Sequence, residues 1–268
     1  MITQSSSRSI RRSRKICIKR LTFSTLGCPG YNPGEIISLA KRFGFESVEL
    51  RGIGDELDVD SIHWLQPGNL GSTADLFADA GIRICSLDCS AFLARPGARI
   101  GECVFASHAA AKLGAPYIRV FGGGSGERDI DTAAKRTDEL CALEPTVTVL
   151  LETHDSFSDT EPIRSFASRV KRPNFGILWD VEHTIRAGVD SAEFVSEFAP
   201  LIKHVHLKDY SESGLCLPGD GLVDFCGIRD LLESAGYQGL FSLEWEKRWV
   251  RTLPGIETAL ERFIEIMK

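Results

Sequence analysis

Strand-like and helix-like segments alternate along this chain, and the alternation limits the folds that it can adopt. Amphipathic segments such as residues 33–44, 71–81 and 100–114 have a helical pattern and end in glycine. A glycine there permits the left-handed conformation that leads into a tight turn. Strands separated by helices in this way pair in parallel. The strand-like segments are residues 21–25, 47–51, 84–88, 117–121, 147–152, 175–180, 204–208 and 240–245.

Eight such units predict that the sheet closes into a (β/α)8 TIM barrel, as a single α/β domain. The length of 268 residues is usual for one such domain. An open doubly wound sheet would instead bind its ligand at a switch point, usually under a glycine-rich loop. The candidate loop is VFGGGSGE, residues 120–127, which lacks the helix-opening G-x-G-x-x-G pattern. We therefore interpret it as a turn at the rim of the barrel.

The net charge of -6 is unevenly distributed. Residues 1–20 carry seven basic residues and no acidic ones, so removing this segment leaves -13 on the rest of the chain. Phosphates of nucleic acids require a positive surface, so nucleic acid is not an expected partner and a small molecule is. We interpret residues 1–20 as a basic, disordered extension, with an organelle transit peptide as the alternative. Residues 21–268 form the predicted barrel.

The cysteines and the apolar segments indicate a cytoplasmic protein. There are eight cysteines and no C-x-x-C pair, so the pattern favours reduced thiols over a zinc finger. No apolar segment approaches the roughly 18 residues that a membrane helix needs, so no membrane association is expected. The sequence leaves the oligomeric state open, and a homo-oligomer is compatible with it.

Four strand-like segments in the C-terminal half each end near a side chain that can bind a divalent metal. The carboxyl ends of barrel strands meet at one rim, so these side chains can converge on one ion. Taken alone, each carboxylate could be an exposed strand end, and the histidine could be a core residue. A set that is mostly oxygen suits Mn²⁺ best, with Mg²⁺, Co²⁺ or Zn²⁺ as alternatives. The four residues are Glu152, Asp180, His206 and Glu244.

Other polar residues are predicted to lie near the same rim. His204 and His206 share one side of their strand, so one can bind the metal while the other supports it from below. Lys208 follows on that side and is a candidate for contact with a substrate. Arg51 and Arg119 could each bind a phosphate or a carboxylate, or could pair with a nearby barrel glutamate. The sequence does not decide between these two uses.

Several short strings resemble the xylose isomerase-like group of the sugar isomerase and epimerase superfamily. They are FSTLGCP, VELR, LETHD, ILWDVEH, HVHLKD, PGDG and LEWE, and the resemblance covers nearly the whole chain from residue 21. It implies that the four residues named above are the metal ligands. It also implies that Glu152 and Glu244 act as an acid/base pair, and that His154, His183 and Lys208 contact the substrate.

The resemblance implies an isomerase or epimerase that acts on a small sugar, ketose or cyclitol, phosphorylated or not. A metal that bridges a carbonyl and the neighbouring hydroxyl stabilises the enediolate formed when a carboxylate removes the intervening proton. The alternative is a lyase that dehydrates an inosose or a dehydroshikimate-type acid. An endonuclease IV-like phosphodiesterase is a weaker match, because its three-metal site needs more histidines than the six here. A binding protein without activity is disfavoured by the complete set of four ligands.

Overall fold

A computed structural model describes residues 18–268 of the chain. One sheet contains eight parallel strands in the order β1-β10-β7-β6-β5-β4-β3-β2. The strands are β1 (Leu21–Phe23), β2 (Ser47–Leu50), β3 (Arg83–Phe92), β4 (Tyr117–Phe121), β5 (Thr148–Glu152), β6 (Phe175–Asp180), β7 (Ile202–Leu207) and β10 (Phe241–Leu243).

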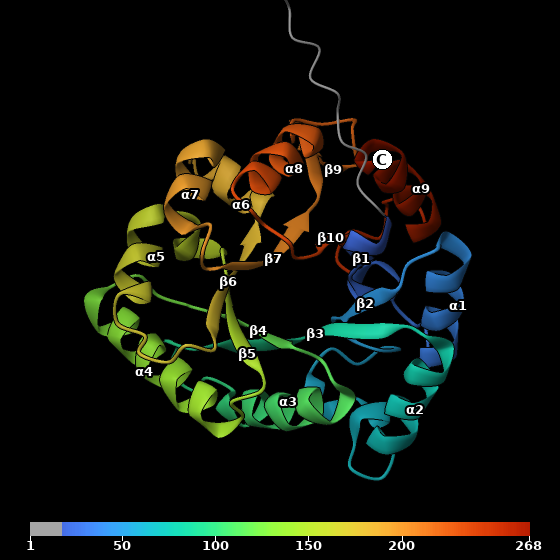
Figure 1. Cartoon of the computed structure of the whole chain (residues 1–268), viewed down its shortest axis with the longest axis horizontal. Helices are drawn as coiled ribbons and strands as arrows, with labels where there is room; N and C mark the ends of the chain where they lie inside the picture. Colours follow the sequence, from blue (N-terminus) through green and yellow to red (C-terminus); the bar gives the residue numbers. More distant parts are fainter. Residues whose placement is uncertain (1–17) are drawn as a thin grey trace, which may run out of the picture.

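Contacts between β1 and β2 close the sheet into a barrel. Ser24, just beyond β1, forms a parallel bridge with Glu49 of β2. Below it, Oγ1 of Thr22 donates a hydrogen bond of 2.9 Å to the carbonyl oxygen of Ser47. The predicted TIM barrel of a single α/β domain is confirmed, and Figure 1 shows the helices as an outer layer around the strands.

The helices follow the predicted pattern, with two additions. Glycines 44, 81 and 114 end α1, α2 and α3 in the left-handed conformation, as expected. The sequence analysis missed the short α6 and the C-terminal α9. The α-helices are α1 (Pro33–Phe43), α2 (Leu70–Ala80), α3 (Ile100–Leu113), α4 (Glu127–Leu143), α5 (Thr160–Ala167), α6 (Val181–Arg186), α7 (Ser191–Phe198), α8 (Phe225–Ser234) and α9 (Ile256–Met267). The 3-10 helices are η1 (Ile18–Arg20), η2 (Thr25–Gly27), η3 (Val59–Ser61), η4 (His63–Leu65) and η5 (Asp155–Ser158).

The first strand of the barrel, β1, begins at Leu21, and within the described residues η1 precedes it. Arg20 in η1 forms an ion pair of 2.8 Å with Glu233 of α8. It also donates a hydrogen bond of 3.0 Å to the carbonyl oxygen of Tyr237. The prediction of a disordered extension falls mostly on residues 1–17, which lie outside the described residues.

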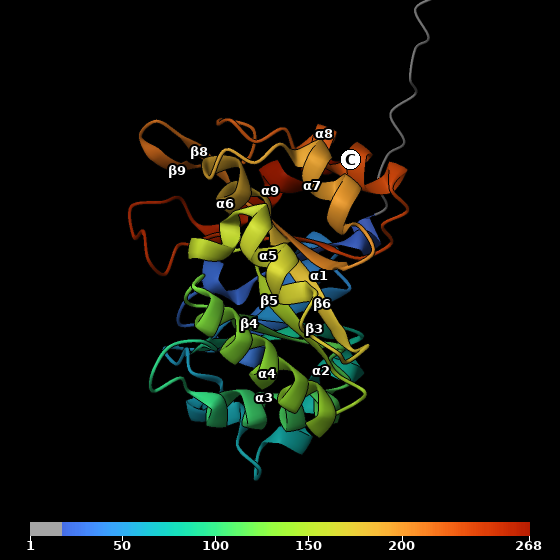
Figure 2. The same ribbon diagram turned by 90° about the vertical axis from the view of Figure 1, so that its left-hand side faces the viewer.

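The loop after β7 is organised by one buried carboxylate. The hairpin of β8 (Asp209–Ser211) and β9 (Gly214–Cys216) projects beyond the barrel in Figure 2. Asp209 accepts hydrogen bonds from the N–H groups of Gly219, Gly221 and Val223, at 2.8, 3.0 and 3.1 Å. The loop therefore folds back against the hairpin.

Buried polar residues line the interior of the barrel near the rim. On β2, Glu49 points to the opposite face from Val48 and Leu50, because side chains alternate along a strand. On β7, His204 and His206 share a face, and both are 0% exposed, as Glu49 is. None of the helices in residues 18–268 has the length and apolar character to cross a membrane.

Candidate metal centre

Four buried side chains converge at the carboxyl-terminal rim of the barrel. Glu152 ends β5, Asp180 ends β6, His206 lies in β7, and Glu244 directly follows β10. All four are at most 5% exposed. One potential ligand atom from each lies within 4.8 Å of those of the other three. The structure thus brings together the four residues that the sequence analysis selected, and their role as ligands stays a prediction.

The donor atoms of this cluster fit a divalent cation. Oε2 of Glu152, Oδ2 of Asp180 and Nδ1 of His206 are fully buried. The two oxygens have ion-pair partners in Arg119 and Lys208, and none of the three atoms forms a hydrogen bond within residues 18–268. Carboxylate oxygens with one imidazole nitrogen are a common ligand set for such ions. A bound cation would satisfy these atoms together.

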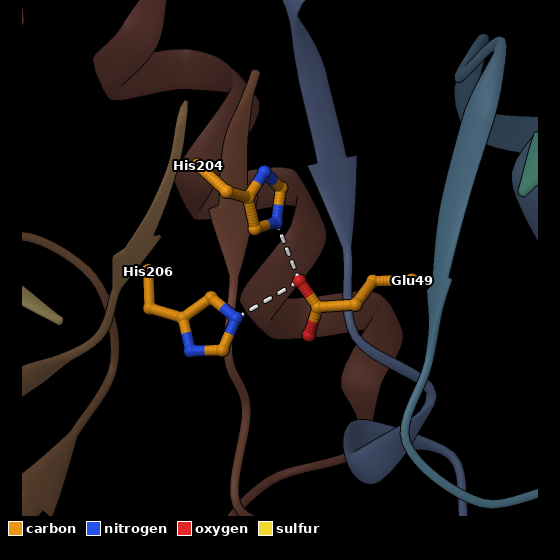
Figure 3. A group of neighbouring side chains, drawn as sticks. All are labelled: Glu49, His204 and His206. Atoms are coloured by element: carbon orange, nitrogen blue, oxygen red, sulfur yellow. Dashed lines mark hydrogen bonds and ion pairs between the residues drawn. The ribbon is translucent and has the colours of Figure 1, made fainter. Parts of the chain in front are cut away.

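Glu49 orients the histidine of the cluster from below. Nε2 of His206 and Nε2 of His204 lie 2.9 and 2.6 Å from the same oxygen of Glu49, as Figure 3 shows. A proton on Nε2 of His206 leaves its Nδ1 free to bind a metal. That Nδ1 lies 3.5 Å from Glu244 and 3.9 Å from Asp180. Although burial opposes it, the two histidines hold the pKa of Glu49 well below its usual range.

Lys208 supplies positive charge directly to the cluster. Its Nζ lies 2.8 Å from Oδ2 of Asp180, 2.6 Å from Oε2 of Glu244 and 2.8 Å from Oε1 of Glu246. Burial favours the neutral amine, but these carboxylates raise the pKa of Lys208 well above its usual value. Nζ is also 3.2 Å from Nε2 of His183. The predicted substrate contact is therefore also a counter-ion for two of the proposed ligands.

The two arginines of the rim have different surroundings. Nε of Arg119 lies 3.0 Å from Oε2 of Glu152, and Nη2 lies 3.6 Å from Asp88. Arg119 therefore adopts the second of its two predicted uses, pairing with a barrel glutamate. Arg51 makes no such pair with any residue in 18–268, and its Nη1 donates a hydrogen bond of 3.3 Å to the carbonyl oxygen of Leu57.

A cavity of about 240 Å³ opens onto the cluster. Its walls include Glu152 and Glu244 but neither Asp180 nor His206. Two aromatic contacts lie on the walls, since the ring of His154 is 4.7 Å from that of His183 and 4.6 Å from that of Phe121. All five residues predicted to contact a substrate line this cavity, namely His154, His183, Lys208, Arg51 and Arg119.

Comparison with known proteins identifies the family of this barrel. The xylose isomerase-like TIM barrel family matches residues 37–266. The chain belongs to this family. One curated relative is an inosose dehydratase of Geobacillus thermodenitrificans strain NG80-2, which is 28% identical over 107 residues, covering 33% of this chain and 36% of that protein. The match thus spans about a third of the relative's length.

Solved structures share the fold over most of the chain. The probable 3-DHS dehydratase AsbF of Bacillus anthracis has a TM-score of 0.76 at 19% identity, covering 92% of this chain and 98% of that one. The IOLI protein, solved with a zinc atom, has a TM-score of 0.76 at 18% identity, with coverages of 92% and 98%. An L-ribulose 3-epimerase has a TM-score of 0.75 at 15% identity, covering 92% of this chain and 94% of that one. The relatives of this xylose isomerase-like barrel thus include epimerases and dehydratases.

Sequence reasoning missed two acidic residues of this xylose isomerase-like site. Glu49 and Asp88 are 0% exposed and lie within β2 and β3. Burial and Glu49 together raise the pKa of Asp88 to about 8, against the effect of Arg119. The available signal was an acidic residue inside an otherwise apolar strand. Such a residue needs a buried partner.

Proposed function

We propose that the chain is a divalent-metal-dependent isomerase or epimerase that acts on a small sugar, ketose, cyclitol or related polyhydroxy carbonyl compound. One observation carries this proposal. Glu152 and Glu244 belong to the buried cluster and also line the cavity, whereas Asp180 and His206 do not line it. The two glutamates can therefore contact a bound substrate while they hold an ion.

The four cluster residues would hold the metal, with Mn²⁺ as the expected ion. A zinc atom in a solved structure of the same fold supports a divalent ion. When bound, the ion supplies the positive charge that stabilises an oxyanion beside a carbanion. Glu49 fixes the ring of His206, Arg119 pairs with Glu152, and Lys208 pairs with Glu244.

Glu152 and Glu244 would move the proton. They come from β5 and β10, which are separated in the sheet by β6 and β7, so they reach the cavity from different parts of its wall. One carboxylate removes the proton from the carbon next to the carbonyl. Return of a proton by the second carboxylate on the opposite face gives an epimer. A single carboxylate that carries the proton to the next carbon gives aldose-ketose isomerisation.

A dehydratase is the second candidate, and two observations favour it. A curated relative that matches about a third of its own length is an inosose dehydratase. In addition, Lys208 and His183 are 3.2 Å apart on the cavity wall, where a proton donor could assist the loss of a hydroxyl group. The first step, removal of a proton beside a carbonyl, is common to both functions.

Proton exchange in heavy water tests the proposal. The metal-loaded protein is incubated with ketoses, their phosphates, polyhydroxy keto acids and inososes in the presence of Mn²⁺ or Co²⁺, and products are analysed by mass spectrometry and NMR. An isomerase or epimerase incorporates deuterium at the alpha carbon without change in composition, whereas a dehydratase forms a product that has lost water. Glu152→Gln should abolish exchange, and the exposed-residue variant Lys135→Gln should retain it. Absence of exchange with every compound would contradict the proposal.

A further inference from the structure

Arg51 differs from the other strong cations of the cavity, because it forms no ion pair with a carboxylate of the described residues. Its side chain is 8% exposed, and within residues 18–268 it makes one hydrogen bond, to the carbonyl oxygen of Leu57. A guanidinium has five N–H donors. Within residues 18–268, Arg51 has no ion pair, whereas Arg119 and Lys208 each contact two or more carboxylates.

The carboxylates that act electrostatically on Arg51 are engaged with other partners. Glu102 accepts hydrogen bonds from two backbone N–H groups, at 2.8 and 3.3 Å. Asp88 and Glu152 both contact Arg119. Burial and the charge of Arg119 lower the pKa of Arg51, although these three carboxylates oppose the shift. A buried cation in this situation gains free energy from an anion that enters the cavity.

The backbone holds Arg51 in place on the cavity wall. Its N–H donates a hydrogen bond of 2.9 Å to Oγ1 of Thr25, which in turn donates one of 2.6 Å to the carbonyl oxygen of Gly52. Gly52 has a φ of +93°, and a Cβ atom there would lie 2.7 Å from the carbonyl oxygen of Glu56. The turn after β2 thus requires glycine and fixes the direction from which Arg51 enters the cavity.

We propose that the substrate carries a carboxylate and that Arg51 binds it. This inference rests on the proposed function, because it takes the cavity as the place where the substrate binds. A planar carboxylate matches two parallel N–H donors of a guanidinium. A phosphate dianion fits less well, because Glu152, Glu244 and Glu246 line the same cavity and repel a second negative charge. The substrate class is therefore a small polyhydroxy keto acid.

Calorimetry with three ring compounds tests this inference without turnover. Quinate carries a carboxylate, myo-inositol is neutral, and myo-inositol 1-phosphate carries a phosphate. We expect the Mn²⁺-loaded full chain to bind quinate at least ~10-fold more tightly than the other two, since a hydrogen bond to a charged group contributes roughly that factor or more. Arg51→Met should remove the preference for quinate, and Arg51→Lys should retain part of it.

Two controls separate the role of Arg51 from general effects. Arg128→Met removes the same charge from the exposed surface of α4 and should leave quinate binding unchanged. The Mn²⁺ affinity of Arg51→Met should equal that of the wild type. The inference would be overturned if quinate and myo-inositol bound equally, if the phosphate were preferred, or if no probe bound. It would also be overturned if Arg51→Met kept the preference for quinate. A preference for quinate without deuterium exchange would instead refute the isomerase and leave the inference standing.

Discussion

The two halves of the barrel contribute different things to the site. Strands β5, β6, β7 and β10 carry the four residues of the buried cluster at or near their ends. Strands β2, β3 and β4 carry Glu49, Asp88 and Arg119, which contact members of the cluster or one another. The C-terminal half thus supplies the candidate ligands and the cation Lys208, whereas the N-terminal half supplies Glu49, which orients His206, and Arg119, which pairs with Glu152. The comparison teaches that the candidate ligands come from four adjacent strands and these supporting residues from the next three.

Loss of a candidate ligand should have the largest effect. In His206→Gln the imidazole nitrogen that faces Glu244 and Asp180 is gone. We expect the Mn²⁺ affinity, measured by calorimetry, to fall by more than ~100-fold. This exceeds the ~10–100-fold loss expected when a residue that only orients a ligand is replaced. Thermal unfolding controls for folding. If the affinity changed by less than ~10-fold, the cluster would not be the metal site.

Loss of an orienting residue should have a smaller effect. Glu49→Gln removes the charge that faces Nε2 of His206 but keeps an oxygen that can accept its hydrogen bond. We expect a fall in Mn²⁺ affinity of ~10–100-fold. The visible absorption of the Co²⁺ form reports whether the ligand set is preserved. If the Mn²⁺ affinity fell as far as in His206→Gln and the Co²⁺ spectrum changed, Glu49 would be a metal ligand. Ligands would then come from both halves of the barrel.

Asp88 predicts a pH dependence of stability. Its pKa rises from the ordinary value of 3.8 to about 8 in the fold. For a raised pKa, the stabilising contribution is complete below the unfolded-state value and is lost as the pH rises towards 8. Asp88→Asn cannot ionise, so its melting temperature should match the wild type near pH 4 and exceed it by several degrees at pH 8. A difference that is independent of pH would contradict this.

An exposed ion pair in the C-terminal half should have the smallest effect. Asp220, in the loop after β9, pairs with Arg262 of α9 at 2.5 Å, and both side chains are at least 40% exposed. Exposed pairs contribute about 0–1 kcal/mol. Arg262→Met should therefore change the melting temperature by only a few degrees and leave Mn²⁺ affinity unchanged. A change in Mn²⁺ affinity would extend the functional region to the outer layer.

Much of the barrel could be predicted from the sequence, because glycine at helix ends and the alternation of segments are local signals. The C-terminal helix α9 was missed although its apolar residues have helical spacing, since no strand follows to frame it. Strand ends also shifted. Lys208 and Glu244 were placed inside strands, yet β7 ends at Leu207 and β10 at Leu243.

The residues of the candidate site also differ in how far the sequence could predict them. Glu152, Asp180, His206 and Glu244 could be selected because polar residues ended apolar strands. Glu49 could not, because its partner His206 lies 157 positions away in sequence and only the closed barrel brings the two together. The sequence left Arg51 and Arg119 equivalent. Their difference depends on which carboxylates already have partners.

The bridge between Ser24 and Glu49 links closure of the barrel to the proposed metal site. Glu49 lies at the seam where the first strand of the barrel meets the second, and the same residue holds His206 in orientation. A chain with an open seam would lack this support even with all four candidate ligands present. Tight binding of the proposed ion should therefore require a closed barrel, and an ion that binds only the closed form would in turn stabilise it.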